Sequence, residues 1–205
     1  MMKKIFITIC VLVSILSSRG IVYADTISVL QQRLNKVNSF HADFHQKVSD
    51  HRNVILQEED GHLWVARPNY FYSHLSAPNE NILISNGNTI WFYTPCIQQV
   101  SIYSMQQAIH STPLILISCN HLKYWRQYHI LQQGDNFSLT PKVSFNNIKK
   151  FSMNVSQNGI IKKVSIFEED GICISYIFTK YKIEAISSDK FQFSVPNGIT
   201  VDDQR

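Results

Sequence analysis

Hydrophobic side chains recur at every second position along most of this chain, and this period of two limits the fold more than any other feature of the sequence. Between residues 40 and 48, polar side chains occupy the alternate positions His41, Asp43, His45 and Lys47. Successive side chains of a β-strand point to opposite faces, so the segment predicts a strand with one apolar face and one wet face. The predicted apolar face consists of Phe40, Ala42, Phe44, Gln46 and Val48.

The same alternation predicts strands through the rest of the chain. Their short connections favour antiparallel pairing, and Ser85-Asn86-Gly87-Asn88 is typical of a hairpin turn that needs positive φ. Together the segments predict one curved antiparallel sheet of about ten to eleven strands. Besides 40–48, the candidate segments from which these strands would come are 54–58, 61–67, 70–76, 81–85, 89–93, 127–131, 137–141, 148–155, 161–168, 172–182 and 191–195.

Three helical segments interrupt this pattern. Residues 25–38 carry apolar side chains at spacings of three and four, and Thr26 is the expected N-cap. Residues 104–110 have weak helical character, and Thr112-Pro113 is a good start for a short apolar helix over 114–117. Helices beside an antiparallel sheet indicate an α+β fold, in which they pack on one side of the sheet.

The N-terminus has the features of a secretory signal. Two lysines precede an apolar run at residues 5–16, and Val22-Tyr23-Ala24 has the small-x-small spacing of a cleavage site. The apolar run is too short to span a bilayer. We therefore expect residues 1–24 to be removed, leaving 25–205 as a single domain in the bacterial periplasm.

The net charge of the chain is much lower once the expected signal segment is left out of the count. The formal charge of +4 suggests a nucleic-acid or anionic-membrane partner, but cleavage removes three basic residues and no acid and leaves 16 Lys and Arg against 15 Asp and Glu. A nearly neutral protein without a second long apolar run predicts no nucleic-acid partner and no stable membrane insertion. Its cysteines, Cys96, Cys119 and Cys173, lack metal-site spacing and serve either in packing or in one disulfide with a free thiol left over.

Two clusters carry candidate chemistry. His41, Asp43 and His45 share one strand face at intervals of about 7 Å, as metal ligands could; the alternative, which the lack of a partner ligand favours, is a solvated face. Ser187 and Lys190 have the spacing of a serine–lysine acylation motif, against the simpler interpretation of a polar turn. We expect no catalytic residue, no metal and no cofactor.

The chain holds more large apolar side chains than these motifs explain, with 12% aromatic residues. One account is an ordinary core between helices and sheet. The other is a hollow core, a cavity for an apolar ligand closed by the helices of residues 104–118. Hydrophobic periodicity alone does not separate these two accounts.

Five segments, taken in their order and spacing, carry a resemblance to a known family. They are Ser39-Phe-His-Ala-Asp-Phe-His-Gln-Lys47, Gly61-His-Leu-Trp-Val-Ala-Arg-Pro-Asn69 with Phe71, Ser85-Asn-Gly-Asn-Thr-Ile-Trp-Phe-Tyr93, Thr112-Pro113 and Pro196-Asn-Gly-Ile-Thr-Val-Asp-Asp-Gln-Arg205. In these the chain resembles the periplasmic outer-membrane lipoprotein carriers, the LolA family. The resemblance implies an unclosed half β-barrel with a helical lid over a hydrophobic cavity.

The resemblance also implies roles for individual residues. The family pattern Gly-x-Leu-x-x-x-Arg-Pro makes Arg67 the gate of the lid, with its partners among the backbone carbonyls near Leu34, Ile117 and Ser118 in the closed form. Strand parity agrees, because Arg67 shares a face with the apolar positions 63 and 65. Ser73 stands where the family often has an aromatic residue. The expected acyl-chain cavity is lined by Phe40, Phe44, Leu63, Val65, Leu114 and, at its mouth, Phe71.

The function that the resemblance implies is that of a monomeric carrier. It would accept triacylated lipoproteins from an inner-membrane ATP-binding-cassette release complex, shield their acyl chains and pass them to an outer-membrane lipoprotein receptor. A sensor or receptor that uses the same half-barrel is the alternative, although the residue after the cleavage site is Asp25 and not a lipidated Cys. A small hydrolase or metal enzyme built on the two clusters above is the remaining hypothesis.

Overall fold

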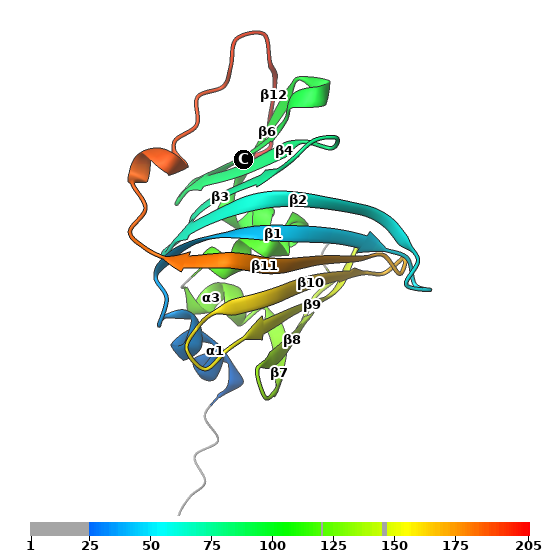
Figure 1. Cartoon of the computed structure of the whole chain (residues 1–205), viewed down its shortest axis with the longest axis vertical. Coiled ribbons are helices and arrows are strands. Elements are labelled where there is room, and N and C mark those ends of the chain that lie inside the picture. The colour runs from blue at the N-terminus through cyan, green and yellow to red at the C-terminus, as the bar shows by residue number, and fades with distance from the viewer. Residues whose placement is uncertain (1–24, 120, 145–146) are drawn as a thin grey trace, which may run out of the picture.

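The protein is an open, strongly curved sheet wrapped around short helices (Figure 1). The structure, a computed structural model, describes residues 25–119, 121–144 and 147–205, so the expected signal segment at 1–24 lies outside it. Twelve strands follow the order β12-β6-β5-β4-β3-β2-β1-β11-β10-β9-β8-β7. All neighbours pair antiparallel except β12 and β6, which pair parallel. The edges β12 and β7 do not pair with each other within the described residues, which confirms the α+β half-barrel predicted from the sequence.

The strands are the curved wall of the molecule. They run over β1 Ser39–Ser49, β2 Ile55–Ala66, β3 Tyr70–Leu75, β4 Asn81–Asn86, β5 Thr89–Thr94, β6 Gln99–Ser104, β7 Tyr128–Gln133, β8 Asn136–Pro141, β9 Ile148–Val155, β10 Ile161–Glu168, β11 Cys173–Ile183 and β12 Thr200–Asp203.

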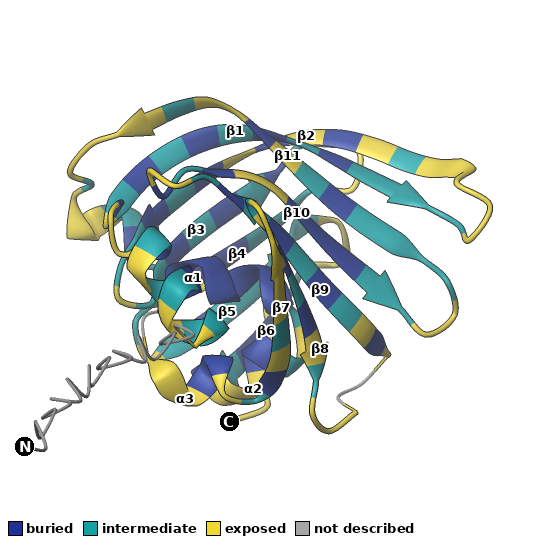
Figure 2. Cartoon of the chain, turned by 90° about the horizontal axis from the view of Figure 1, so that it is seen from below, coloured by how far each residue is buried: buried dark blue, intermediate teal, exposed yellow. Residues whose placement is uncertain are grey.

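Short helices lie against the concave face of this wall (Figure 2). Asp25, and not Thr26, caps the first helix, since its carboxylate accepts from the backbone N–H of Ile27 at 3.4 Å. Ser104 and Gln107 form a capping box at the start of the second. The helices over the concave face are α1 Thr26–Leu34, α2 Met105–Ser111, the 3₁₀-helix η2 Pro113–Ser118 and α3 Leu122–Trp125; two further 3₁₀ turns are η1 Pro95–Ile97 and η3 Ser188–Phe191.

The core lies between the concave face and these helices. In β1 the predicted alternation is confirmed: Phe40, Ala42 and Phe44 are buried, while the positions between them are half-exposed (Figure 2). Gly61 of β2 lies opposite Phe44, whose ring occupies the space that a Cβ on Gly61 would need. Close packing across the sheet therefore requires glycine at this position.

Three segments differ from the expectations. The two strands expected at 54–58 and 61–67 form one long strand, β2, which runs from Ile55 to Ala66. Strand β6 was not expected, because η1 interrupts the pattern before it. Residues 191–195 form no strand, although their apolar residues alternate. Phe191 packs instead on Tyr70 with 5.5 Å between ring centroids, and Phe193 on Trp91 at 6.0 Å. The C-terminal segment thus buries its aromatic rings against the sheet without joining it, and pairs only afterwards, as β12.

Candidate functional site: the lid and the concave face

Arg67 follows the last residue of β2 and links the sheet to two parts of the helical lid. Leu63 and Val65 are fully buried on the concave face, and strand parity aims Arg67 the same way. Its Nη1 donates to the carbonyl oxygen of Val37, just after α1, and its Nη2 donates to that of Ile117 in η2 at 2.7 Å. One guanidinium group therefore bonds both lid segments.

The resemblance implied that one of these acceptors lies near Leu34. Leu34 is buried at 1% exposure, but its carbonyl accepts the backbone N–H of Val37 at 3.2 Å in the turn that ends α1. The carbonyl that accepts from Arg67 on this side is that of Val37, three residues after Leu34. Arg67 does donate to the carbonyl of Ile117, one of the partners that the resemblance implied; its role as a gate stays a prediction.

A backbone hydrogen bond next to Arg67 also joins the lid to the sheet. Asn69 N–H donates to the carbonyl of Ser118, the last residue of η2, at 2.9 Å. Asn69 has a φ of +69°, which asparagine adopts more readily than most residues, and Ser85 Oγ donates to its carbonyl at 2.6 Å. Ser118 thus bonds Asn69 and not Arg67. Sequence reasoning missed both Val37 and Asn69, because backbone acceptors and donors leave no pattern in side chains.

The surroundings of Arg67 are apolar. Burial lowers the pKa of its guanidinium to about 10, which leaves it charged at neutral pH. The group lies 5.9 Å from the ring centroid of Phe40, which stacks in turn on Tyr181 at 4.4 Å. Its Nε is buried without a hydrogen-bond partner in the described part of the chain. The charge is therefore held in place by two backbone carbonyls and a π face.

The lid fills the concave face with apolar side chains. All six residues of η2 are buried, and β2, β3 and β10 contact this helix. From α1, Leu30 and Leu34 complete the layer, at 0% and 1% exposure. The lid side chains in this layer are Leu30, Leu34, Leu114, Ile115, Leu116 and Ile117.

Most of the expected cavity residues lie beneath this closed lid. Four of them have 0% exposure and pack in the core: Phe40, Leu63, Val65 and Phe71. Phe71 is therefore not at a mouth in this closed form. The other two, Phe44 and Leu114, border a cavity of about 210 Å³ that the lid leaves open.

This remaining cavity lies at the end of the sheet away from α1. It is bordered by the last residue of β3, Leu75, the first of β4, Asn81, and the last of β10, Glu168. Ser73, at 7% exposure, also lines it, as do the rings of Phe92 and Tyr176. Burial raises the pKa of the Tyr176 phenol well above its usual value. The cavity thus combines apolar walls with several polar groups.

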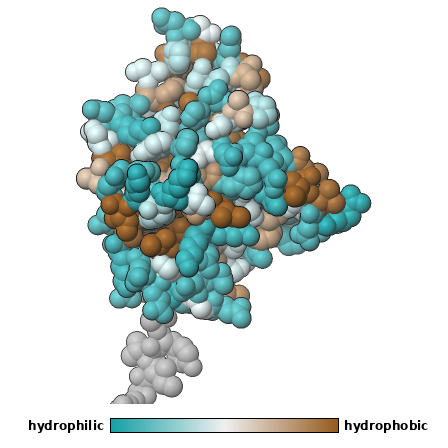
Figure 3. Space-filling model, viewed as in Figure 1, coloured by the Kyte–Doolittle hydropathy of each residue, from teal (hydrophilic) through white to brown (hydrophobic). Residues whose placement is uncertain are grey.

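The β1–β2 hairpin projects from this same end, because Val48 of β1 pairs with Ile174, which lines the cavity. The hairpin exposes three consecutive apolar side chains, Val54, Ile55 and Leu56, by 50%, 49% and 57%. Figure 3 shows an apolar patch on the projecting end of the molecule where this hairpin lies. An apolar surface therefore sits beside the opening of the cavity.

The histidine cluster of β1 faces away from the lid, and its side chains contact nearby acidic and basic groups. His41 Nδ1 lies 2.7 Å from Glu184, and His45 Nδ1 lies 2.9 Å from Asp60. Asp43 contacts both His62 and Lys180, at 2.7 and 2.8 Å, and its pKa is lowered by these hydrogen bonds. Within the described residues, no group of three or more His, Cys, Asp or Glu side chains is arranged to hold a metal ion.

In the second cluster, the side chains of Ser187 and Lys190 have different partners. Ser187 Oγ accepts from the backbone N–H of Asp189 at the start of η3. The Nζ of Lys190 lies 3.7 Å from the ring centroid of Trp64 and 4.1 Å from that of Tyr72. Serine and lysine thus serve a turn and a cation–π contact. Cys96, Cys119 and Cys173 are all free thiols.

The fold and the site together define the class: a half-barrel binding protein whose apolar concave face is closed by a hydrogen-bonded helical lid. In the described part of the chain, no helix is long and apolar enough to cross a membrane. Residues 35–194 match the family described as outer membrane lipoprotein carrier protein LolA, and the chain belongs to this family.

Two relatives named outer-membrane lipoprotein carrier protein match the whole length of the chain. The one from Erwinia tasmaniensis is 47% identical and the one from Yersinia enterocolitica 42% identical, each over 204 residues and 100% of both chains. Among solved structures, an uncharacterized conserved protein from Thermus thermophilus is similar with a TM-score of 0.56 and 10% identity, over 88% of this chain and 100% of its own. That likeness shows the fold alone.

Proposed function

We propose that this chain carries triacylated lipoproteins through the periplasm, from an inner-membrane ATP-driven release complex to an outer-membrane receptor. The observation that carries the proposal is a lid of apolar side chains that fills the concave face and is held to the sheet by a few hydrogen bonds at residues 67–69. Residues 1–24 are the cleaved signal, and 25–205 act as one monomeric domain with no catalytic residue or cofactor.

The energetics of acyl chains explain why such a carrier needs a donor machine. An acyl chain of about sixteen carbons gains roughly 0.8 kcal/mol for each buried CH₂, or on the order of 13 kcal/mol per chain. Spontaneous departure from a membrane is therefore negligible. The release complex supplies the work of extraction, and the carrier supplies an apolar surface that keeps the chains from water.

The lid must move to expose that surface. The cavity of about 210 Å³ is smaller than the range of about 300–1,000 Å³ found for small-ligand pockets, so it does not hold three acyl chains. When η2 and α1 swing away, the chains take the places of Leu114 and Ile117 against Phe40, Leu63 and Phe71. The lid covers the apolar surface in the closed state and the acyl chains cover it in the open state, so the free energies of the two states are similar.

Arg67 sets part of the free-energy difference between the closed and the open lid. Its two hydrogen bonds stabilise the closed lid by roughly 1.5–3 kcal/mol each, because the donor is charged. Cargo must displace them to open the lid, and their re-formation favours release at the receptor. The apolar β1–β2 hairpin beside the cavity lies where the chains would enter and leave.

Native mass spectrometry of the mature protein tests the proposal. The protein is incubated with donor membranes, ATP and the release machinery, and the masses of the complexes are measured. We expect a one-to-one complex with a triacylated lipoprotein. The same cargo with its acylated cysteine replaced by serine is the matched control, and no complex with it should form.

Two results would overturn the proposal. One is a bare protein in a reaction in which a second, established carrier becomes loaded, which would favour the sensor alternative. The other is equal binding of acylated and unacylated cargo, which would show that the apolar face does not recognise acyl chains.

A further inference from the structure

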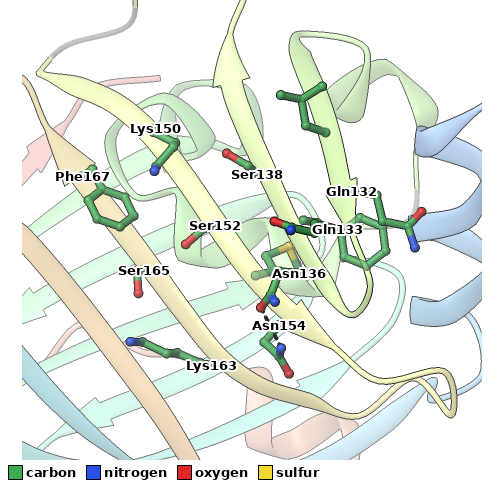
Figure 4. A pocket seen from close by; sticks show the side chains of 13 residues that line it. Gln132, Gln133, Asn136, Ser138, Lys150, Ser152, Asn154, Lys163, Ser165 and Phe167 are labelled. Carbon is green, nitrogen blue, oxygen red and sulfur yellow. Dashed lines mark hydrogen bonds between the residues drawn. The ribbon is translucent and has the colours of Figure 1, made fainter.

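A groove of about 710 Å³ lies on the outer face of β7 to β10, the face turned away from the lid (Figure 4). On β9, Phe151 and Met153 point into the core, so the alternate residue Ser152 points outward. On β10, Ile166 is in the core and Ser165 points outward in the same way. The groove therefore belongs to a surface that the proposed carrier function does not use.

The floor of the groove is formed by small polar side chains in one row across the sheet. Ser138 of β8 pairs with Ser152, which pairs with Ser165, and all three line the groove. Ser175 of β11 pairs with Ser165 just outside this lining. The hydroxyls of Ser165 and Ser175 lie 2.9 Å apart. Two strand spacings of about 4.8 Å give this floor a length of roughly 10 Å, which about three extended residues span.

Longer side chains form the walls. On one side, Lys163 pairs in register with Asn154, whose amide donates to the side chain of Asn136 at 2.8 Å. On the other side, the Nζ of Lys150 lies 4.2 Å from the ring centroid of Phe167. Figure 4 shows these side chains on both sides of the serines. The recess therefore has hydrogen-bond donors on both walls, beside the apolar side chains of Leu131 and Phe167.

The groove carries positive charge without neutralising acids. Its lining includes Lys150 and Lys163 and contains no Asp or Glu. Neither lysine forms an ion pair with any described residue, whereas Lys47 on β1, two strands away from β10, pairs with Glu58 at 3.1 Å. Unpaired lysines on both walls complement a ligand that carries carboxylates.

We propose that this outer groove binds an acidic, extended polypeptide segment of a partner protein. The floor, in which Ser165 is only 3% exposed, fits a single extended chain between the two lysines. Serine, asparagine and glutamine side chains bond the peptide backbone, and the two lysines bond its carboxylates. The surface is opposite the acyl-chain face, so a partner can dock while cargo is bound.

Fluorescence anisotropy with two labelled hexapeptides tests the proposal. One alternates Asp and Ser, and the other has Asn in place of each Asp. We expect the acidic peptide to bind and the Asn peptide to bind at least about tenfold more weakly. The double variant Lys150→Gln/Lys163→Gln should lose about tenfold in affinity for the acidic peptide.

Matched variants distinguish binding in the groove from non-specific attraction between opposite charges. Lys149→Gln/Lys162→Gln makes the same charge change on the same two strands outside the groove lining, and should bind within about twofold of the unmodified protein. Ser152→Leu fills the floor without changing charge and should also weaken binding. Circular dichroism checks that each variant is folded.

Equal losses in both double lysine variants, or undiminished binding to folded Ser152→Leu, would overturn the groove as the site. Equal binding of both peptides would overturn the acidic ligand. Lysine-dependent binding to phosphatidylglycerol vesicles, with no binding of the acidic peptide, would assign the surface to a membrane and contradict the proposal. Cargo loading is measured separately, so a failure of the carrier function remains distinguishable.

Discussion

The Nη2 of Arg67 lies 2.7 Å from the carbonyl oxygen of Ile117, and this one bond joins the end of β2 to the most buried helix of the lid. Its guanidinium also bonds Val37, so the same side chain restrains both lid segments. Any change in lid position must break these bonds.

We therefore expect Arg67→Leu to accept cargo but to transfer it poorly. Without the charged bonds the closed lid competes less with acyl chains, so apparent cargo affinity rises and transfer to the receptor falls by about tenfold or more. A reconstituted transfer assay measures this effect. Arg126→Leu changes an exposed arginine outside the lid bonds and should transfer normally. Normal transfer by Arg67→Leu would refute the gate.

Cys119 provides a chemical readout of lid position. It directly follows η2, is 1% exposed, and burial raises the pKa of its thiol to about 12. A thiol needs access and its thiolate form to react, so Cys119 should resist maleimide in the closed state while exposed Cys96 reacts at once.

The alkylation rate of Cys119, followed by mass spectrometry in a Cys96→Ser/Cys173→Ser background, should rise severalfold when Arg67→Leu is added. Cargo should have the same effect, because it displaces η2. A Cys119 that reacts as fast as Cys96 in the closed protein would contradict a sealed lid.

Gly61 tests the packing of the concave face. A Cβ at this position would meet the ring of Phe44 and approach the carbonyl oxygen of His74 to 2.5 Å. Because the carbonyl belongs to the backbone of β3, relief requires strand movement. We expect Gly61→Ala to lower the free energy of unfolding by about 1–3 kcal/mol, measured by urea denaturation.

A double-mutant cycle identifies the cause of that loss. Phe44→Leu removes part of the ring that a new Cβ would meet, so Gly61→Ala should cost less in its presence. Strictly additive effects would show that the ring is not responsible.

The parts of the fold that can be predicted from the sequence are those that depend on local patterns. The alternation at 40–48 predicts β1, since whether a side chain is buried or exposed depends only on whether its position in the strand is odd or even. The C-terminal segment could not be predicted in this way. Phe191 and Phe193 alternate with polar residues as in a strand, yet their rings pack on aromatic rings of the sheet. Which apolar surface an alternating segment covers is decided by the tertiary structure.

The site shows the same limit. Strand parity placed Arg67 on the concave face, and the family pattern placed Ile117 near it. Val37 and Asn69 take part through backbone atoms, whose position depends on how α1 and η2 end. No side-chain pattern encodes those positions. The acceptor expected near Leu34 is the carbonyl of Val37, which follows the turn at the end of α1.

The outer face of β1 predicts a pH effect. The hydrogen bond from His45 to Asp60, at 2.9 Å, raises the pKa of the imidazole above its ordinary value of 6.5. A group whose pKa is higher in the folded state stabilises the fold fully below its unfolded pKa, and this contribution is lost as pH rises through the folded pKa. His45 should therefore favour the fold at mildly acidic pH.

Nuclear magnetic resonance titration of the His45 ring protons checks this directly. Asp60→Asn keeps the shape of the partner but removes the charge that favours imidazolium, so the pKa of His45 should fall towards its ordinary value. Asp203→Asn, on the far edge strand β12, makes the same change elsewhere and should leave His45 unaffected. If both variants leave the titration unchanged, the contact with Asp60 does not set the charge of His45, and the stabilisation at acidic pH disappears with it.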